Sequence, residues 1–515
     1  MNPVSFPTQG EVIQFAFDAL GVFPRKHDDV ASFDETKKKS TQKALQRLAL
    51  EEGTLDQQRL GEMIQTLSYL VAGSIPPREC FTLGDTLLDL FDIYQNMLRD
   101  EGTFLSKSET AKYFLRDSAV LRLPISIAKH IQRYNVAADA LVVPADTYWY
   151  LPSKGPNGWI FPLEKVMRWA YELAETSIQK FHWPDDADLT TQEKNLESAK
   201  KWLAGIHLPA WPTLLNNFNQ SFQALDREQA KQGRASLSET QKNSIRTALF
   251  VARASTYISK LVLHHYDDTV LQECCSRYQI VANCVNDDAQ KIRDFVQKLI
   301  VRDDIPSNEW DHVWFDVSTD YWLQFVGKHD AVVQALEQQQ ITMIEAAEIS
   351  RSFGGFAALP FEKPELFSPQ HSIPPGFSEA ICDGFALQKS TDLSIEKIEE
   401  YAARLDNSKL CHVLPWMVSW QRATYHYRAE RYEDAYPFIK ESFEKAQYCA
   451  GKNQYLLINQ YIELAAKNDK WKDFKKGIEW ATYLGFEVRW LRKDEPTDEK
   501  LKCVFAIMKK ARYAV

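Results

Sequence analysis

Apolar residues recur at intervals of three and four along most of this chain, and that spacing constrains its fold more than any other feature. Between residues 54 and 73 they stand at Leu60, Met63, Ile64, Leu67, Leu70 and Val71. Residues three and four apart lie on one face of an α-helix, so this stretch predicts a helix with one buried side. The stretch 162–181 has the same spacing and opens with a proline, which suits the first turn of a helix. We therefore predict a mostly α-helical protein whose body consists of antiparallel helix pairs.

Glycine usage supports this prediction. Only 19 of the 515 residues are glycine, whereas about 7% is usual, so the tight turns that a large all-β fold requires are scarce. One segment differs, because residues 147–161 combine aromatic residues with prolines around a Lys-Gly-Pro-Asn-Gly turn. It predicts a possible small β-hairpin, with strands near 147–151 and 158–161, at an exposed edge.

Capping patterns predict where several helices begin. Ser or Thr followed three residues later by Glu or Gln occurs at residues 106–109, 190–193 and 238–241. The segment 264–268, His-His-Tyr-Asp-Asp, predicts a helix end near Tyr266, followed by Asp267 or Asp268 as the cap of the next helix. Adjacent side chains on a helix point about 100° apart, so the two histidines do not suit one metal ion.

A proline-rich stretch divides the chain. Five prolines fall between residues 359 and 378, and proline cannot continue a helix. We predict a strap on the surface at 359–378, between a helical body at 1–358 and a C-terminal helical module at 379–515. The polar stretch near 227–237 marks a possible further boundary inside the body.

Two segments near the C-terminus share a pattern with a spacing of 39 residues. In the first, Ala435 of Tyr432-Glu433-Asp434-Ala435 follows the small residue Ala423 by twelve residues, and Ile439 follows Ala435 by one helical turn. In the second, Trp471, Phe474 and Ile478 occupy the matching positions, with the larger Phe474 in place of an alanine. Residues 416–484 thereby resemble tetratricopeptide repeats, which are helix–turn–helix units of about 34 residues. The resemblance implies a stack of helical hairpins with a concave surface that binds a peptide or a partner protein.

Charge and hydropathy exclude several classes of protein. The net charge is −9, which disfavours sequence-independent binding of nucleic acid. No uncharged apolar run is long enough to span a membrane, and the first residues do not resemble a secretory signal. The eight cysteines form no Cys-x-x-Cys pair. A cytoplasmic protein with reduced thiols, without a membrane partner, is therefore expected.

Catalytic motifs are missing from the sequence. It contains no phosphate-binding loop, no dinucleotide fingerprint, no His-Glu-x-x-His and no Gly-x-Ser-x-Gly. We therefore assign no catalytic residue, metal ligand or cofactor, and we lean against an enzyme. The aromatic residues Trp310, Trp314, Trp322 and Phe325 stand at helical spacing and are expected in the core.

These observations favour an interaction protein, such as a scaffold or adaptor of a multi-protein assembly, that binds a protein partner or its own copy through the C-terminal module. The candidate partner-binding residues are Tyr432, Lys472, Lys475, Lys476, Trp149 and Trp159. Two alternatives stay open. One is an enzyme or ligand sensor with a pocket in residues 1–358, and the other is a component associated with nucleic acid through the basic C-terminal segments.

Overall fold

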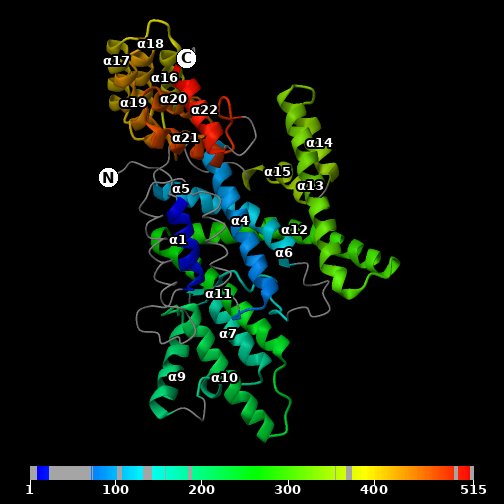
Figure 1. Ribbon diagram of the computed structural model, residues 1–515. Helices are drawn as coiled ribbons and strands as arrows, with labels where there is room; N and C mark the ends of the chain where they lie inside the picture. The colour runs from blue at the N-terminus through cyan, green and yellow to red at the C-terminus, as the bar shows by residue number, and fades with distance from the viewer. Residues whose placement is uncertain are drawn as a thin grey trace.

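The computed structural model describes most of the chain and shows a largely helical protein, as predicted (Figure 1). The described residues are 9–22, 71, 73–100, 107–131, 142–156, 158–183, 188–353, 355–366, 374–491 and 497–510. The helix predicted between residues 54 and 73 and the start predicted at residue 106 lie outside them, apart from residues 71 and 73. Figure 1 shows three parts, which are a body, an arm that projects from it, and a C-terminal stack of helices.

The body is built around two long consecutive helices, α11 (Glu239–His265) and α12 (Asp268–Arg302). Helices α1 and α7 pack on α11, and α6 packs on α12. The other described helices of the body are α1 (Gln9–Leu20), α4 (Pro77–Asp100), α5 (Lys107–Tyr113), the π-helix η1 (Phe114–Ala119), α6 (Val120–Ile131), α7 (Pro162–Leu173), α8 (Ile178–Phe181), α9 (Leu189–Leu203) and α10 (Trp211–Lys231). The polar stretch near 227–237 forms the end of α10 and its short link to α11, and these two helices contact each other.

Local capping explains several helix boundaries. Ser238 and Gln241 form the predicted capping box at the start of α11. Helix α11 ends at His265, and the Asp267 side chain accepts a hydrogen bond of 2.9 Å from the Val270 amide at the start of α12, as predicted. The start predicted at residues 190–193 is wrong by two residues. Asp188 caps α9 instead, because its carboxylate lies 3.0 Å from the Thr191 amide.

The predicted hairpin exists but is shorter than expected. Strands β1 (Ser153–Gly155) and β2 (Gly158–Ile160) are antiparallel, with Ser153 opposite Ile160. The first strand does not begin at residue 147, because residues 146–151 form consecutive turns. In these turns the Trp149 amide donates to the Asp146 carbonyl and the Leu151 amide donates to the Tyr148 carbonyl.

The arm consists of α13 (Trp310–Glu337) and α14 (Met343–Phe353), and α15 (Gly355–Glu362) leads back to the body. A short 3-10 turn, η3 (Ser307–Glu309), precedes it. Trp314 is 1% exposed and packs against α12, as predicted, and Trp310 is partly buried beside it. The side chains of Trp322 and Phe325 lie outside the described part of the chain.

The proline-rich stretch is only partly a strap. Pro360 lies inside α15, which continues to Glu362, so the expectation that proline ends the helix here is wrong. Ala358 and Leu359, the two residues before Pro360, are buried, and their burial offsets the one hydrogen bond that a proline ring removes. A 3-10 turn, η4 (Pro364–Leu366), follows, and residues 367–373 lie outside the description.

The C-terminal module is a stack of three helix pairs. The pairs are α16 (Phe377–Lys389) with α17 (Ile395–Asn407), α18 (Met417–Arg428) with α19 (Tyr432–Ala446), and α20 (Gln454–Lys467) with α21 (Trp471–Tyr483). A 3-10 turn, η5 (Gly451–Asn453), precedes α20, and α22 (Asp498–Lys510) packs against it. None of the described helices is both long and apolar enough to cross a membrane.

Side chains link the first helices of successive pairs. The Gln421 amide on α18 donates to the Gly384 carbonyl of α16 at 3.0 Å. The Trp420 indole, also on α18, donates to Gln460 of α20 at 2.7 Å. Two connecting turns are alike, because Glu430 and Asp469, 39 residues apart, have φ angles of 58° and 56°. The pairs therefore repeat in space with the spacing seen in the sequence, and the tetratricopeptide resemblance itself stays a prediction.

The stack and the body share one hydrophobic core. Gln454, at the start of α20, is 1% exposed and joins the two parts. Its amide nitrogen donates to the Leu98 carbonyl of α4 at 3.1 Å, and its amide oxygen accepts from the Trp480 indole at 2.9 Å. The stack is thus fastened to the C-terminal end of α4 by buried packing and by hydrogen bonds.

Candidate interaction surfaces

The three predicted lysines lie on α21, and two of them contact the stack itself. Lys472 is exposed. The Lys475 ammonium lies 3.9 Å from the Asp498 carboxylate of α22. The Lys476 ammonium lies 5.9 Å from the ring centroid of the buried Phe443. The basic face of α21 is therefore less available to a partner protein than the sequence suggests.

Tyr432 is half-buried at the turn between α18 and α19. The Lys467 ammonium lies 4.6 Å from its ring centroid. Lys467 also pairs with Glu463 at 3.6 Å, and the Tyr427 hydroxyl donates to the same carboxylate at 2.6 Å. Burial raises the pKa of the Glu463 carboxyl above its usual range. These contacts make Tyr432 part of a polar network between successive helix pairs.

The two predicted aromatic residues near the hairpin fold onto the body. Trp149 was predicted to contact a partner, but it is only 9% exposed, so little of its ring is available for such a contact. The turns over residues 146–151 place this ring beside Tyr150, with the ring centroids 5.5 Å apart. Trp159 is half-buried, and its indole donates to Asp268 at 2.9 Å. The hairpin is thereby attached to the first turn of α12.

Another surface of the stack, which the sequence did not reveal, presents aromatic and basic side chains. We call it the aromatic turn surface, and it consists of Tyr455, Leu456, Phe486, Arg489 and Trp490. The rings of Tyr455 and Phe486 meet edge to face with centroids 5.7 Å apart, and the Arg489 amide donates to the Asn459 side chain at 3.3 Å. These contacts hold the segment after α21 against α20.

Trp490 has an unusual conformation in this surface. It is the third residue of a turn closed by the Leu491 amide donating to the Val488 carbonyl at 3.0 Å. Its φ angle is 72°, in the left-handed region that this position of a type II turn requires and that glycine or asparagine usually occupies. Its side chain is nevertheless 55% exposed. No glycine or asparagine marks the turn, so the sequence carries no signal for it.

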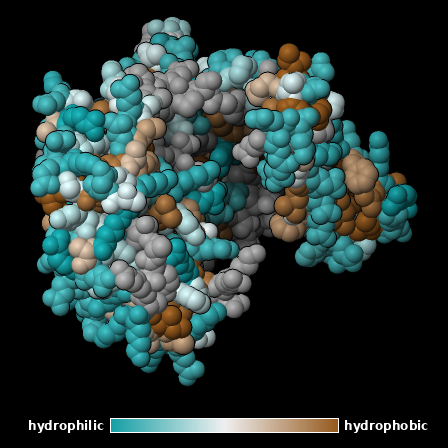
Figure 2. All heavy atoms as spheres, turned by 90° about the horizontal axis from the view of Figure 1, so that it is seen from above, coloured by the Kyte–Doolittle hydropathy of each residue, from teal (hydrophilic) through white to brown (hydrophobic). Residues whose placement is uncertain are grey.

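The arm presents a second apolar surface. Met343 and Ile344, at the start of α14, are 67% and 73% exposed. Ile349 on the same helix is also exposed, as is Leu323 on α13. Figure 2 shows the arm standing apart from the rest of the molecule across a hollow, with hydrophobic side chains along it. Exposed apolar side chains gathered on a projecting element are typical of a site of protein contact.

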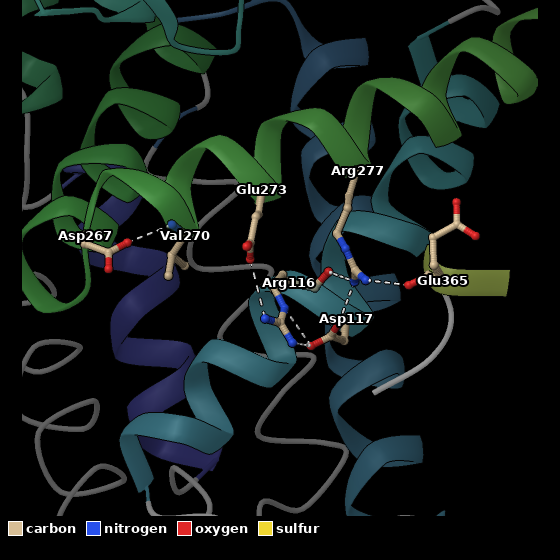
Figure 3. Close-up of polar contacts among 7 residues, drawn as sticks. All are labelled: Arg116, Asp117, Asp267, Val270, Glu273, Arg277 and Glu365. Carbon is tan, nitrogen blue, oxygen red and sulfur yellow. Dashed lines mark hydrogen bonds and ion pairs between the residues drawn. The ribbon is translucent and has the colours of Figure 1, made fainter. Parts of the chain in front are cut away.

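A buried cluster of charges lies where η1 meets α12 (Figure 3). Arg116 donates two hydrogen bonds to Asp117, at 3.0 and 2.7 Å, and reaches Glu273 at 3.5 Å. Arg277 donates to the other oxygen of Asp117 and, at 3.0 Å, to the Glu365 carbonyl. Asp117 thus lies between two arginines, and its side chain is 5% exposed.

This cluster joins elements rather than presenting groups to a ligand. Both oxygens of Asp117 are occupied by arginines, and both arginine side chains are at least nine-tenths buried. The π-helix places the consecutive residues Arg116 and Asp117 toward the same helix, α12. The contacts fasten η1 and η4 to α12. Among the described residues, no group of three or more His, Cys, Asp or Glu side chains is arranged to hold a metal ion.

Comparison with known proteins identified no relative. No family model matches the chain, and neither the curated proteins nor the solved structures contain a match.

Proposed function

We propose that this chain is a protein-interaction scaffold whose C-terminal stack binds a segment of a partner protein at the aromatic turn surface. The observation that supports this proposal is Trp490, which combines a left-handed backbone with a largely exposed indole. A left-handed conformation costs an ordinary residue about 1–2 kcal/mol. Strain of this kind is concentrated at functional sites, where binding makes use of the constrained side chain.

The composition of the surface indicates the chemistry of the partner segment. Tryptophan, tyrosine and arginine are the residues most enriched at the energetic centres of protein interfaces, and all three occur here within one turn and one helix start. The surface also has two basic residues, Arg489 and the exposed Lys452. We therefore expect a segment that carries apolar anchors for Trp490 and Leu456 and acidic residues for the two cations.

The proposal is tested by affinity capture of the full chain, with the captured proteins quantified by mass spectrometry. Trp490→Ala removes the ring, and Arg489→Glu reverses the charge beside it. A matched control is Leu189→Ala on α9, which truncates another apolar side chain that is 63% exposed. We expect both surface variants to lose a stoichiometric partner that the wild type and the control retain. Retention of that partner by Trp490→Ala would contradict the proposal.

A further inference from the structure

We infer that a second copy of this chain occupies the aromatic turn surface, and that it does so with the tip of its arm. The tip consists of Met343, Ile344, Glu348 and Ile349 on α14. The inference rests on the proposed function, because it assigns a partner to the same surface. It is carried by three properties of the arm, which are its fixed direction, its exposed apolar end and its charge.

The arm is held rigidly at both of its ends on α12. At one end, Trp314 of α13 is buried against α12. At the other end, the carboxylate of Asp288 on α12 accepts a hydrogen bond of 3.1 Å from the Phe356 amide at the start of α15. Asp288 is 2% exposed. A Cβ atom at Gly355, where φ is 56°, would lie 2.2 Å from that carboxylate, so only glycine permits this approach. The arm therefore cannot fold back onto its own stack without unpacking from α12.

The tip offers an ordered apolar surface. Thr342 and Glu345 cap the start of α14 reciprocally. The Thr342 amide donates to the Glu345 carboxylate at 2.8 Å, and the Glu345 amide donates to the Thr342 hydroxyl at 3.2 Å. Ile344 and Ile349, with Glu348 between them, are exposed on the helix that this box fixes. A helix that presents two exposed isoleucines five residues apart, with the acidic Glu348 between them, matches the chemistry expected of the partner segment.

The two segments of the chain that carry these surfaces have opposite net charges. Residues 310–353, which form the arm, contain seven acidic and two basic residues, a net charge of −5. Residues 452–515, which include the aromatic turn surface, contain fourteen basic and nine acidic residues, a net charge of +5. Opposite potentials of this size attract and orient two copies before they touch. Like charges would instead separate two arms or two stacks, so a contact between the arm of one copy and the stack of the next is favoured.

Such a contact is head-to-tail, because each copy contributes one arm tip and one aromatic turn surface. Sedimentation velocity of the full chain over a range of concentrations and salt tests it. We expect the wild type to self-associate at low salt and to dissociate as salt rises. Ile344→Asp and Trp490→Ala are each expected to raise the dissociation constant about tenfold or more. Leu189→Asp, a change of the same kind on α9, is the control and should associate like the wild type.

A mixing experiment identifies the geometry of the contact. The Ile344→Asp chain keeps an intact aromatic turn surface, and the Trp490→Ala chain keeps an intact arm tip. Mixing two chains that are each monomeric should therefore yield a one-to-one heterodimer that grows no further. The charge pair gives a second test, since Glu348→Arg and Arg489→Glu should each weaken association and the double variant should recover it.

Two results would overturn the inference. One is a wild-type chain that stays monomeric at all concentrations at low salt, and the other is undiminished self-association of both the Ile344→Asp and the Trp490→Ala chains. The proposed function is judged separately. If Trp490→Ala loses a captured protein of different sequence while the wild type is monomeric, the scaffold proposal holds and the assignment of its partner fails.

Discussion

The backbone conformation at Trp490 favours a different residue from the one that the proposed contact requires. Glycine would relax the left-handed backbone, whereas the indole is required for the proposed contact. We expect Trp490→Gly to be about 1 kcal/mol more stable than Trp490→Ala, because only the former relieves the strain. Both variants should fail to bind the partner. Thermal unfolding of the two variants side by side measures this difference, and equal stabilities would show that the turn carries no strain.

His182 is a buried base whose proton uptake is linked to stability. Its Nε2 lies 2.8 Å from the Tyr171 hydroxyl, and its Nδ1 lies 2.6 Å from the side-chain oxygen of Asn217, to which it donates. Burial lowers the pKa of His182 from 6.5 to about 4. The unfolded chain therefore binds a proton below pH 6.5 that the folded chain does not bind until pH 4, and stability falls as pH falls through this window.

We expect this histidine to remove about 2 kcal/mol of stability between pH 7 and pH 5. Urea unfolding at the two pH values measures the loss. His182→Gln, which cannot titrate, is the control, and its own change with pH is subtracted. If the His182→Gln chain loses as much stability between pH 7 and pH 5 as the wild type, the loss arises from other titrating groups.

At the scale of elements, α12 is the helix on which α6, η1, α13 and α15 pack, and two of its side chains are expected to contribute different amounts to stability. Arg277 pairs with the buried Asp117 and holds η4, whereas Asp267 only caps the first turn. We expect Arg277→Met to cost about 3 kcal/mol, because it breaks a buried charge pair. Asp267→Ala should cost about 1 kcal/mol, the usual contribution of an N-cap. Chemical denaturation monitored by tryptophan fluorescence gives the free energy of unfolding of both variants. Equal losses would mean that the Arg277–Asp117 pair contributes no more to stability than the helix cap.

Elements were predictable from the sequence where their signals are local. The capping box at Ser238 was identified, and the cap of α12 was narrowed to Asp267 or Asp268, because each cap acts on an amide three residues away. Asp188 was missed because Thr190, two residues later, begins a capping pattern with Glu193 and offers another capable oxygen. The Arg277–Asp117 pair joins residues 160 positions apart, and no local pattern indicates it. The same holds for the turn at Trp490, since its conformation depends on the contacts of Phe486 and Arg489 with α20.

At the scale of the whole molecule, the body and the stack are expected to lose stability together. Gln454→Leu fills the same space but leaves the Leu98 carbonyl and the Trp480 indole without their buried partner. An unsatisfied buried polar group costs about 1–3 kcal/mol, so the two together should cost about 3 kcal/mol. Hydrogen exchange should then accelerate at the end of α4 and in α21 at once. Thr482→Ala, at an exposed position of α21, is the control. If hydrogen exchange in the Gln454→Leu chain became faster in α21 alone, the body and the stack would be held independently.

Helix α12 has a length that matters for how distant surfaces influence each other. Its 35 residues span about 52 Å, at 1.5 Å per residue. The indole of Trp159 and the ammonium of Lys154 meet Asp268 in its first turn, and the arm is anchored toward its other end. The length of α12 therefore sets how far the hairpin lies from the base of the arm, and the two surfaces are separated by a single continuous helix.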